Sequence, residues 1–391
     1  MSIVLPDRGA EIPFQAGRNV LSNGMPRKPK FTFVDLFAGI GGFHQALHQL
    51  GGRCVMVCER DKFARRSYEA FHKAKLKPGF FVDNSESDPG VWTFPDDIQK
   101  VTLSTTSLPE RQWAKHVSEH VGRCDVVCAG FPCQPFSQAG QKKGFDDTRG
   151  TLFHDVTRII KAKKAKAFFL ENVRGLIAHD FDAKHVRSKN LSKKAKTGKT
   201  LRTIHDKLFK RTYPGGVKYH APFVDEDPRC IAPGVFLVKA SEHGLPQNRP
   251  RVFIIGFRSK KMASRFKLPP TEELPKGSLA KILGVKSVHM KGSVSSPLRE
   301  VGFTLRCGGK RSPIDDKRNW DQYYVLGMRA KRVKPMPITW KHGLKLQGFP
   351  GKKRLPQGVS SAQMMKQLGN SVAVPAIKAW GEKIAKAISK S

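Results

Sequence analysis

The chain has 391 residues, enough for one large domain or for a large and a small one. It carries 71 Lys and Arg against 32 Asp and Glu, a formal net charge of +39. Such a basic chain is typical of proteins that bind nucleic acid, although a general basic bias of the host's proteins is an alternative. No apolar run reaches the length of a membrane span and no signal-peptide core is present, so we expect a cytoplasmic protein.

The cysteines argue against a cross-linked or metal-stapled fold. There are 7 of them, spread over the whole chain, with no CxxC pair and no ligand-like spacing. We therefore expect neither a disulfide framework nor a structural metal site, which fits a reducing compartment.

The first half of the chain alternates between buried strands and helices. Residues 1–30 lack periodicity and are interpreted as an arm, and "FTFVDLF" (31–37) is the first predicted strand. Further strands are predicted at 54–59, 124–130, 167–172 and 251–257, with helices at 43–52, 61–72 and 151–162 between them. Continuous apolar strands that alternate with helices predict an α/β fold, in which a doubly wound parallel sheet is covered on both faces.

The rest of the chain divides by composition. The segment 184–211 is dense in Lys and Arg, and it is either a solvated loop leading into a helix at about 200–210 or an element that contacts phosphates. Over 259–338 the βα rhythm is lost, which predicts a small, irregular β-rich domain. Helical character returns over 339–391.

Acidic residues and glycines follow the first strands. Asp35 ends the first strand, and Gly39, Gly41 and Gly42 make the turn, in a GxGG spacing that differs from the dinucleotide fingerprint. Either this is a structural tight turn or it lets a ligand approach the backbone closely. Glu59 ends the second strand, where it suits ribose hydroxyls, and Asp97 is predicted at a third strand tip, where it would accept from an adenine amino group. Together they favour an adenosine cofactor that carries no phosphate.

The stretch "AGFPCQPFSQAG" (129–140) places Cys133 in a Pro/Gln/Ser loop after a strand. A role as a buried thiol suits the cysteines within apolar strands better than it suits Cys133, so a nucleophile and a structural residue both stay open. Glu171 follows another strand and is either a helix cap or a general acid. Arg249 and Arg251 alternate with Gln247 and should face one way, either to hold a substrate or as a surface salt-bridge ladder.

The blocks "DLFAGIGGF", "GFPCQPFSQAGQKKGFDDTRGTLF", "ENVRGL", "QNRPRVFIIGF" and "QLGNSVAVP", in this order, resemble the DNA (cytosine-5) methyltransferase family. The resemblance implies a Rossmann-like S-adenosylmethionine-dependent methyltransferase domain over 31–258, carrying the basic insertion. It implies a target-recognition domain over 259–338 and a C-terminal segment, 339–391, that completes the catalytic domain. The cofactor, S-adenosyl-L-methionine, would be held by Phe37, Ala38, Gly39, Gly41, Glu59, Asp97, Ile98, Pro132, Leu152, Asn370 and Val372.

The same resemblance implies the reaction. Cys133 would add to C6 of a cytosine flipped out of a specific double-stranded DNA sequence, Glu171 would protonate N3, and Arg249 with Arg251 would orient the base. The residues expected to contact DNA are Gln134, Ser137, Arg306, Lys310, Arg311, Arg318 and Asn319. A tRNA cytosine-5 methyltransferase and a non-catalytic DNA-binding module are the alternatives. We expect a monomer from a bacterial or phage-infected cell, associated with the nucleoid and accompanied by a cognate restriction endonuclease.

Overall fold

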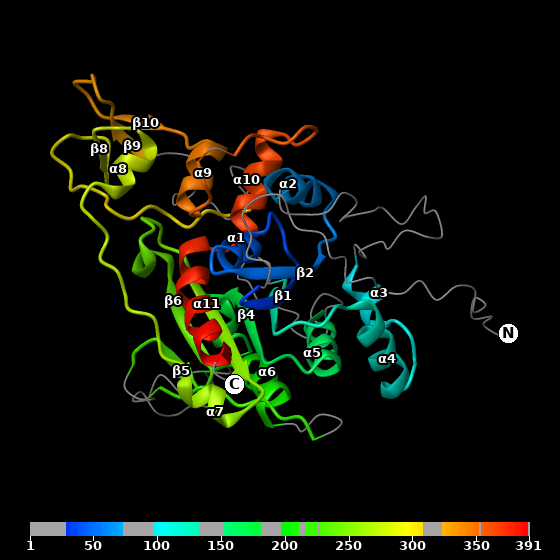
Figure 1. Cartoon of the computed structure of the whole chain (residues 1–391). Helices are drawn as coiled ribbons and strands as arrows, with labels where there is room; N and C mark the ends of the chain where they lie inside the picture. Colours follow the sequence, from blue (N-terminus) through cyan, green and yellow to red (C-terminus); the bar gives the residue numbers. More distant parts are fainter. Residues whose placement is uncertain are drawn as a thin grey trace.

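The fold is seen in a computed structural model, which describes residues 29–72, 97–132, 152–180, 197–210, 216–224, 227–307, 323–351 and 353–389. Its centre is a seven-stranded sheet with the order β2-β1-β3-β4-β7-β6-β5 (Figure 1). The strands are β1 (Phe31–Leu36), β2 (Gly52–Cys58), β3 (Val126–Gly130), β4 (Ala167–Val173), β5 (Cys230–Ala232), β6 (Val235–Lys239) and β7 (Pro250–Phe257).

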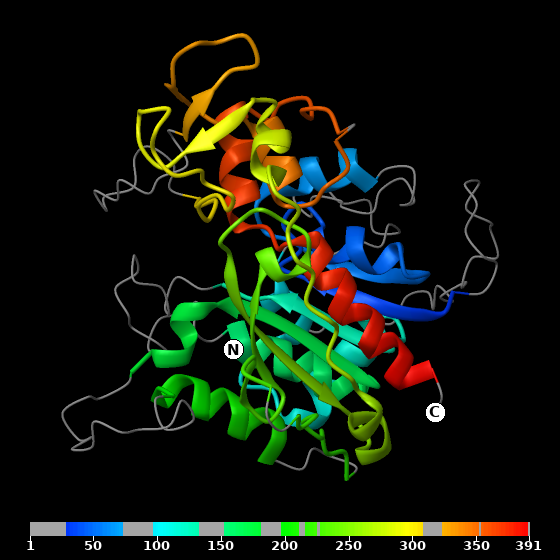
Figure 2. The ribbon, with the colours of Figure 1, turned by 90° about the vertical axis from the view of Figure 1, so that its left-hand side faces the viewer.

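Helices cover both faces of this sheet because its strands are apolar on both sides. One face packs against α1 (Gly42–His48) and α11 (Val374–Ser389), with Phe43, Phe169 and Trp380 in its core. The other packs against α4 (Glu110–His120), α5 (Leu152–Lys163) and α6 (Lys199–His205). Figure 2 shows α11, in red, running along one face of the central strands. The α/β class predicted from the sequence is confirmed.

The prediction of an all-parallel sheet is wrong for three strands. β1, β2, β3 and β4 run parallel, whereas β7 runs antiparallel to both β4 and β6, and β5 is antiparallel to β6. Strands β5 and β6 were not predicted, and only the two-residue link Pro233–Gly234 separates them. A link this short can join antiparallel strands only, since a parallel pair needs a crossover of a dozen or more residues.

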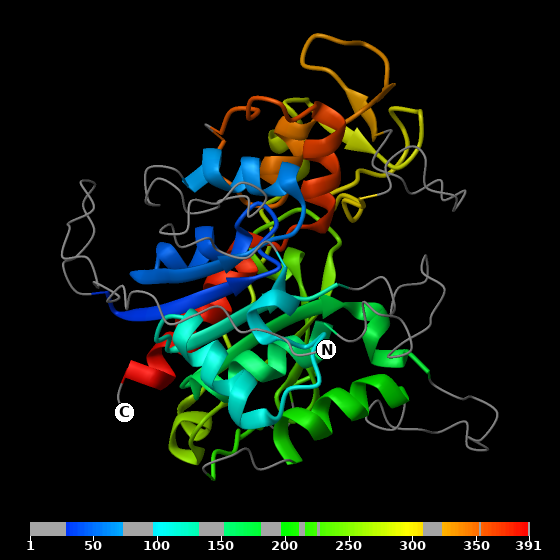
Figure 3. The same cartoon turned by 90° about the vertical axis from the view of Figure 1, so that its right-hand side faces the viewer.

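A small lobe stands at the end of the molecule in yellow to red (Figure 3). It contains α8 (Ser278–Leu283), a three-stranded antiparallel sheet, α9 (Trp340–Leu346) and α10 (Ser361–Asn370). The sheet is formed by β8 (Ser287–His289), β9 (Tyr323–Leu326) and β10 (Lys334–Met336). Here "small lobe" means residues 278–370. Its strands are short and the connections between them are long, and the domain bounds of 259–338 stay a prediction.

The remaining helices and turns of the described ranges connect these parts. α2 (Lys62–His72) lies between the first strands and α10, and α3 (Ile98–Thr102) precedes α4. In the basic segment, α6 continues into a π-helical turn, η8 (Asp206–Lys210), so the helix predicted at about 200–210 is confirmed. α7 (Lys260–Arg265) follows β7, and short 3-10 turns lie at η5 (Arg174–Ala178) and η9 (Ala240–His243). None of the helices in the described ranges is both long and apolar enough for a membrane span.

Candidate active site

The glycine turn after β1 opens toward empty space at the carboxyl edge of the parallel strands. Gly39 has φ +57°, and a Cβ added there would meet no atom of the described part of the chain within 4 Å. Gly42 serves packing instead, since a Cβ there would lie 2.5 Å from Cγ2 of Val372. The sequence was compatible with two roles for this turn, a structural one and the binding of a ligand. The open space at Gly39 favours the binding of a ligand.

Glu59 fixes this turn from the neighbouring strand. Its Oε2 accepts a hydrogen bond from Gly39 N at 2.7 Å, and its Oε1 accepts one from Asp61 N at 2.8 Å. Burial raises the pKa of Glu59, while these two backbone donors lower it. Each carboxylate oxygen keeps a second lone pair, so the group can still accept hydrogen bonds from ligand hydroxyls.

Asp35 is the least satisfied acid at this edge. Its side chain is fully buried, Oδ2 accepts from His44 N at 3.3 Å, and Oδ1 has no hydrogen-bond partner among the described residues. Burial raises the pKa of Asp35 well above the ordinary range of aspartic acids. A buried acceptor without a partner is costly, and it fits a site that a polar ligand completes.

A buried aromatic network under the glycine turn was not predicted from the sequence. Tyr68 Oη lies 2.6 Å from His44 Nδ1, and His72 Nε2 lies 3.2 Å from the carbonyl of Ile40. The spacing of four between Tyr68 and His72 puts both on one face of α2, and this periodicity is the signal that could have found them. The network contacts the glycine turn through the carbonyl of Ile40.

Asp97 begins the described range 97–132, and residues 73–96 before it lie outside the described residues, so its place at a strand tip stays a prediction. Asp97 is the N-cap of α3, and its Oδ1 accepts from Gln99 N at 3.0 Å. Aspartate is a preferred N-cap, which explains why the residue begins a helix. Ile98, its neighbour, is buried in the core, and Leu152 is the first residue of α5.

The C-terminal part of the chain returns to the glycine turn, as the resemblance implied. Val372 is buried against Gly42, and the exposed Asn370 ends α10 just before it. A Cβ on Gly381 would lie 2.5 Å from Leu47, which shows how closely α11 packs on α1 (Figure 1).

Glu171 and Arg251 form an ion pair at the centre of the sheet edge. Arg251 Nε lies 2.9 Å from Glu171 Oε1, with the two side chains 14% and 10% exposed. In the β4–β7 register Arg251 faces Val173, two residues beyond Glu171, so the pair is a diagonal on one face. Gly130 lies opposite Glu171 on β3, and its added Cβ would be 3.6 Å from Glu171 Oε2.

Two opposing influences act on Glu171. Burial raises its pKa, and the charges of Arg251 and Arg249 lower it. The net direction is upward, which is the direction a carboxyl group needs if it is to carry a proton near neutral pH.

The end of β3 leads to the predicted nucleophile. Asn172 Nδ2 donates to the carbonyl of Phe131 at 3.3 Å, and partly buried Pro132 follows. Cys133, Gln134 and Ser137 lie outside the described residues. The sequence analysis assigned no role to Asn172, and its hydrogen bond to the chain before Cys133 appears only in the structure.

The guanidinium of Arg249 is engaged by main-chain carbonyls. Nη1 donates to Leu305 at 3.0 Å, and Nη2 donates to Gly369 at 2.9 Å and to Ser371. It lies close enough to Glu171 to lower the pKa of that residue. Arg306, next to Leu305, is half-buried, whereas Lys310, Arg311, Arg318 and Asn319 lie outside the described residues.

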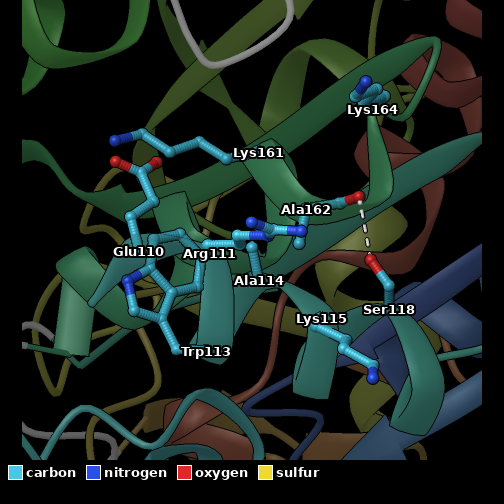
Figure 4. A pocket seen from close by; sticks show the side chains of 9 residues that line it. All are labelled: Glu110, Arg111, Trp113, Ala114, Lys115, Ser118, Lys161, Ala162 and Lys164. Atoms are coloured by element: carbon cyan, nitrogen blue, oxygen red, sulfur yellow. Dashed lines mark hydrogen bonds between the residues drawn. The ribbon is translucent and has the colours of Figure 1, made fainter. Parts of the chain in front are cut away.

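A separate hollow lies between α4 and α5, far from these groups in the sheet (Figure 4). It measures about 370 Å³ and includes Lys161 and Lys164, at the end of α5 that precedes the start of β4. The hollow therefore lies at the edge of the sheet where the parallel strands begin. Glu171 lies at the opposite edge. In Figure 4 Lys115 and Lys164 occupy different ends of the hollow, so its bases do not converge.

Comparison with known proteins decides the family. The family model for C-5 cytosine-specific DNA methylases matches residues 31–300, more than half of the chain. The chain belongs to this family. It is therefore a DNA cytosine-5 methyltransferase, which confirms the resemblance seen in its sequence blocks.

Individual relatives of the methylase cover nearly its whole length. Type II methyltransferase M.HpaII of Haemophilus parainfluenzae is 34% identical over 91% of this chain and 90% of its own. Type II methyltransferase M.NlaX of Neisseria lactamica is 31% identical over 92% of this chain and 97% of its own.

Solved structures share the fold of the methylase. The Entamoeba histolytica methyltransferase EhMeth matches with a TM-score of 0.56 at 13% identity, covering 91% of this chain and 98% of its own. A Spodoptera frugiperda DNMT2 mutant matches with a TM-score of 0.55 at 18% identity, over 90% and 99%. At these identities the likeness shows the fold alone.

Proposed function

We propose that the protein transfers a methyl group from S-adenosyl-L-methionine to C5 of a cytosine flipped out of a specific double-stranded DNA sequence. The observation that carries the proposal is the buried Glu171–Arg251 pair beside Gly130, on the strand that leads to Cys133. A carboxyl group with a raised pKa, next to a cation and a cysteine-bearing loop, suits acid-assisted addition of a thiolate.

The proposed chemistry starts at C6 of the base. The Cys133 thiolate forms an S–C6 bond, and a proton from Glu171 reaches N3 as the C5–C6 electrons shift, which leaves an enamine. C5 would then attack the methyl group that S-adenosylmethionine supplies, as the methyl–sulfur bond breaks and S-adenosylhomocysteine leaves. A base removes the proton at C5, the C5–C6 double bond reforms as the thiolate leaves, and the N3 proton returns to Glu171. Arg251 stays paired with Glu171 and stabilises the carboxylate after it gives up the proton.

The acids at the sheet edge fit a cationic adenosine cofactor. Oδ1 of Asp35, which has no hydrogen-bond partner among the described residues, the Glu59 carboxylate and the open space above Gly39 provide acceptors and room. When bound, S-adenosylmethionine supplies an electrophilic methyl group. In this proposal its methionine part is held by Phe37, Ala38, Gly39 and Gly41, and its ribose is held by Glu59. Asp97 and Ile98 hold its adenine, and Pro132, Leu152, Asn370 and Val372 complete the wall.

The substrate must leave the double helix to react. C6 and N3 of a stacked, paired cytosine are closed to side chains, so the base has to rotate into the site. The net charge of +39 supports a polyanionic substrate. The names of the type II relatives support a bacterial or phage restriction–modification setting with a cognate endonuclease, and we propose a monomer associated with the nucleoid.

Bisulfite sequencing of DNA from cells that express the protein tests the proposal. We expect protected cytosines in one sequence context with the wild type and none with Cys133→Ala. Purified Cys133→Ala should still bind S-adenosylmethionine, which separates loss of chemistry from loss of folding. Methylation by Cys133→Ala comparable to that of the wild type would remove Cys133 from the mechanism.

The same protein should be offered tRNA and duplex DNA side by side with labelled cofactor. Label in the duplex is the expected result. Label in tRNA alone would replace the DNA proposal with the tRNA alternative, and label in neither would leave a binding module without catalysis.

A further inference from the structure

A short extended run before β7, Pro246 to Pro250, buries two polar side chains completely. Gln247 is 0% exposed and Arg249 is 1% exposed. Buried amides and guanidinium groups are stable only when their hydrogen bonds are made within the protein. The partners of these two side chains therefore show what the run holds together.

Gln247 binds two separate segments of the small lobe. Its Oε1 accepts from Leu305 N at 3.0 Å, and its Nε2 donates to the carbonyl of Leu346 at 2.7 Å. The backbone adds to this junction, because Asn248 N donates to Gly302 O and Gly302 N donates to Pro246 O, both at 2.8 Å. The run thus pairs with residues 302–305 and reaches the last residue of α9.

Arg249 extends the junction to the C-terminal segment. It donates to the carbonyl of Leu305, whose amide Gln247 already holds, so both main-chain groups of Leu305 are fixed by these two side chains. It also donates to Gly369 and Ser371, the residues on either side of Asn370. We call Gln247 and Arg249 the clasp.

Three partners of the clasp, Leu305, Gly369 and Ser371, are chain neighbours of residues predicted to contact DNA or the cofactor. Arg251, two residues after Arg249, pairs with Glu171. Arg306 follows Leu305, and Asn370 lies between Gly369 and Ser371. One run of five residues therefore connects the catalytic carboxylate, the small lobe and the predicted cofactor wall.

We propose that the clasp residues are positioning residues, which fix the small lobe and the cofactor wall in register with Glu171. The inference rests on the proposed function, since it concerns how the DNA-reading lobe is aligned with the chemistry. The two residues differ in what they hold, because the side chain of Gln247 binds the small lobe, whereas Arg249 also binds the segment around Asn370. Loss of Gln247 should therefore weaken the use of DNA and leave cofactor binding intact.

The test compares full-length wild type with Gln247→Ala and a matched control, Gln347→Ala. Gln347 is also 0% exposed, and its Nε2 donates to the carbonyl of Leu368 at 2.6 Å, but both residues lie in the small lobe. The measurements are Tm, the Kd of S-adenosylmethionine by calorimetry, the KM for plasmid DNA, and hydrogen exchange at the Leu305 amide. Gln247→Met, which fills the same volume without either hydrogen bond, replaces the alanine variant if that variant does not fold.

For Gln247→Ala we expect the KM for DNA to rise roughly 5- to 150-fold, the range of typical coupling between sites. Its Kd for S-adenosylmethionine should stay unchanged, and the Leu305 amide should lose protection. The control should show a similar fall in Tm with an unchanged KM and a protected Leu305 amide. An unchanged KM in Gln247→Ala, or an equal rise in the control, would overturn the proposal.

Failure of the proposed function gives a different result. If the wild type methylates neither plasmid DNA nor tRNA, the proposed function fails, and exchange at the Leu305 amide still decides whether the clasp forms. If the wild type is active and Leu305 stays protected in Gln247→Ala, the clasp alone fails.

Discussion

Glu171 shows how one residue is prepared by its neighbours in space. Burial in the sheet edge disfavours its charged form, and Arg251 at 2.9 Å favours it. The two influences oppose each other, so the carboxyl group is held where a small change in surroundings shifts its proton. A group that must give a proton to a base and later exist as a carboxylate needs this balance.

This balance predicts the pH dependence of the reaction. If protonated Glu171 is the active form, kcat/KM falls as the pH rises through its raised pKa. In Arg251→Gln the nearest cation is lost, so that pKa rises further and the fall should begin at a higher pH than in the wild type. The measurement is the pH profile of kcat/KM for methyl transfer to DNA.

Two further variants control this profile. Arg251→Lys keeps a cation. Its kcat/KM should therefore fall over nearly the same pH range as that of the wild type, whatever its overall rate. Glu171→Gln cannot ionise, so its kcat/KM should no longer fall as the pH rises. Its kcat should be lower by about 10²- to 10⁴-fold, the usual contribution of a general acid. A fall that moves to lower pH in Arg251→Gln would contradict the assignment of Glu171.

Among the elements, the glycine turn between β1 and α1 depends most on its exact backbone. Glu59 fixes the amide of Gly39 from the end of β2, and Val372 packs on Gly42 from the far end of the chain. The turn therefore joins the first strand, the second strand and the C-terminal segment at one point. Its shape is set by contacts that come from all three.

Substitution of Gly39 by alanine tests the turn as a cofactor cradle. The positive φ of +57° makes an alanine there strained by about 1–2 kcal/mol, and its methyl group would enter the open space above the turn. We expect the Kd of S-adenosylmethionine to rise by at least about tenfold, equivalent to about 1.4 kcal/mol. Calorimetry with the purified variant measures it.

Gly277→Ala is the matched control for this prediction. Gly277 has φ +74°, also with no atom within 4 Å of an added Cβ, but it precedes α8 in the small lobe. Both variants should lose similar stability in thermal unfolding, and only Gly39→Ala should bind the cofactor more weakly. Equal affinities in the two variants would mean that the ligand does not approach Gly39.

In the whole molecule, four acids gather at one sheet edge while the chain as a whole is strongly basic. Asp35 lies near the end of β1, Glu59 follows β2, Glu171 lies in β4 and Asp97 caps α3, against a net charge of +39. This distribution suits a cationic cofactor inside and a polyanion outside. It also predicts how binding responds to salt.

Affinity for duplex DNA should fall steeply as salt is added. Each phosphate that a Lys or Arg neutralises releases a counterion, so 6–10 such contacts would lower affinity by about 10³- to 10⁵-fold between 50 and 200 mM salt. Fluorescence anisotropy with a labelled duplex over this range gives the slope. A shallow slope would show that most of the basic residues contact no phosphate.

The family, the α/β class and the residue types of the site could all be predicted from the amino-acid sequence. The blocks around Gly39, Glu59, Glu171 and Arg251 are local patterns, and a local pattern is readable because strand, turn and acid follow one another along the chain. The alternation of Arg249 and Arg251 with Gln247 also predicted a shared face. Gln247 and Arg249 both bind Leu305, and Arg249 and Arg251 both act on Glu171, which agrees with that prediction.

How these residues are joined depends on the three-dimensional packing of the chain. The antiparallel direction of β7 sets Arg251 diagonally across from Glu171, and no periodicity in the sequence states the direction of a strand. Asp97 caps α3, and this role depends on the conformation of the backbone that follows it. The clasp of Gln247 and Arg249 links residues 56 to 122 positions apart, and such contacts arise from packing of the lobes.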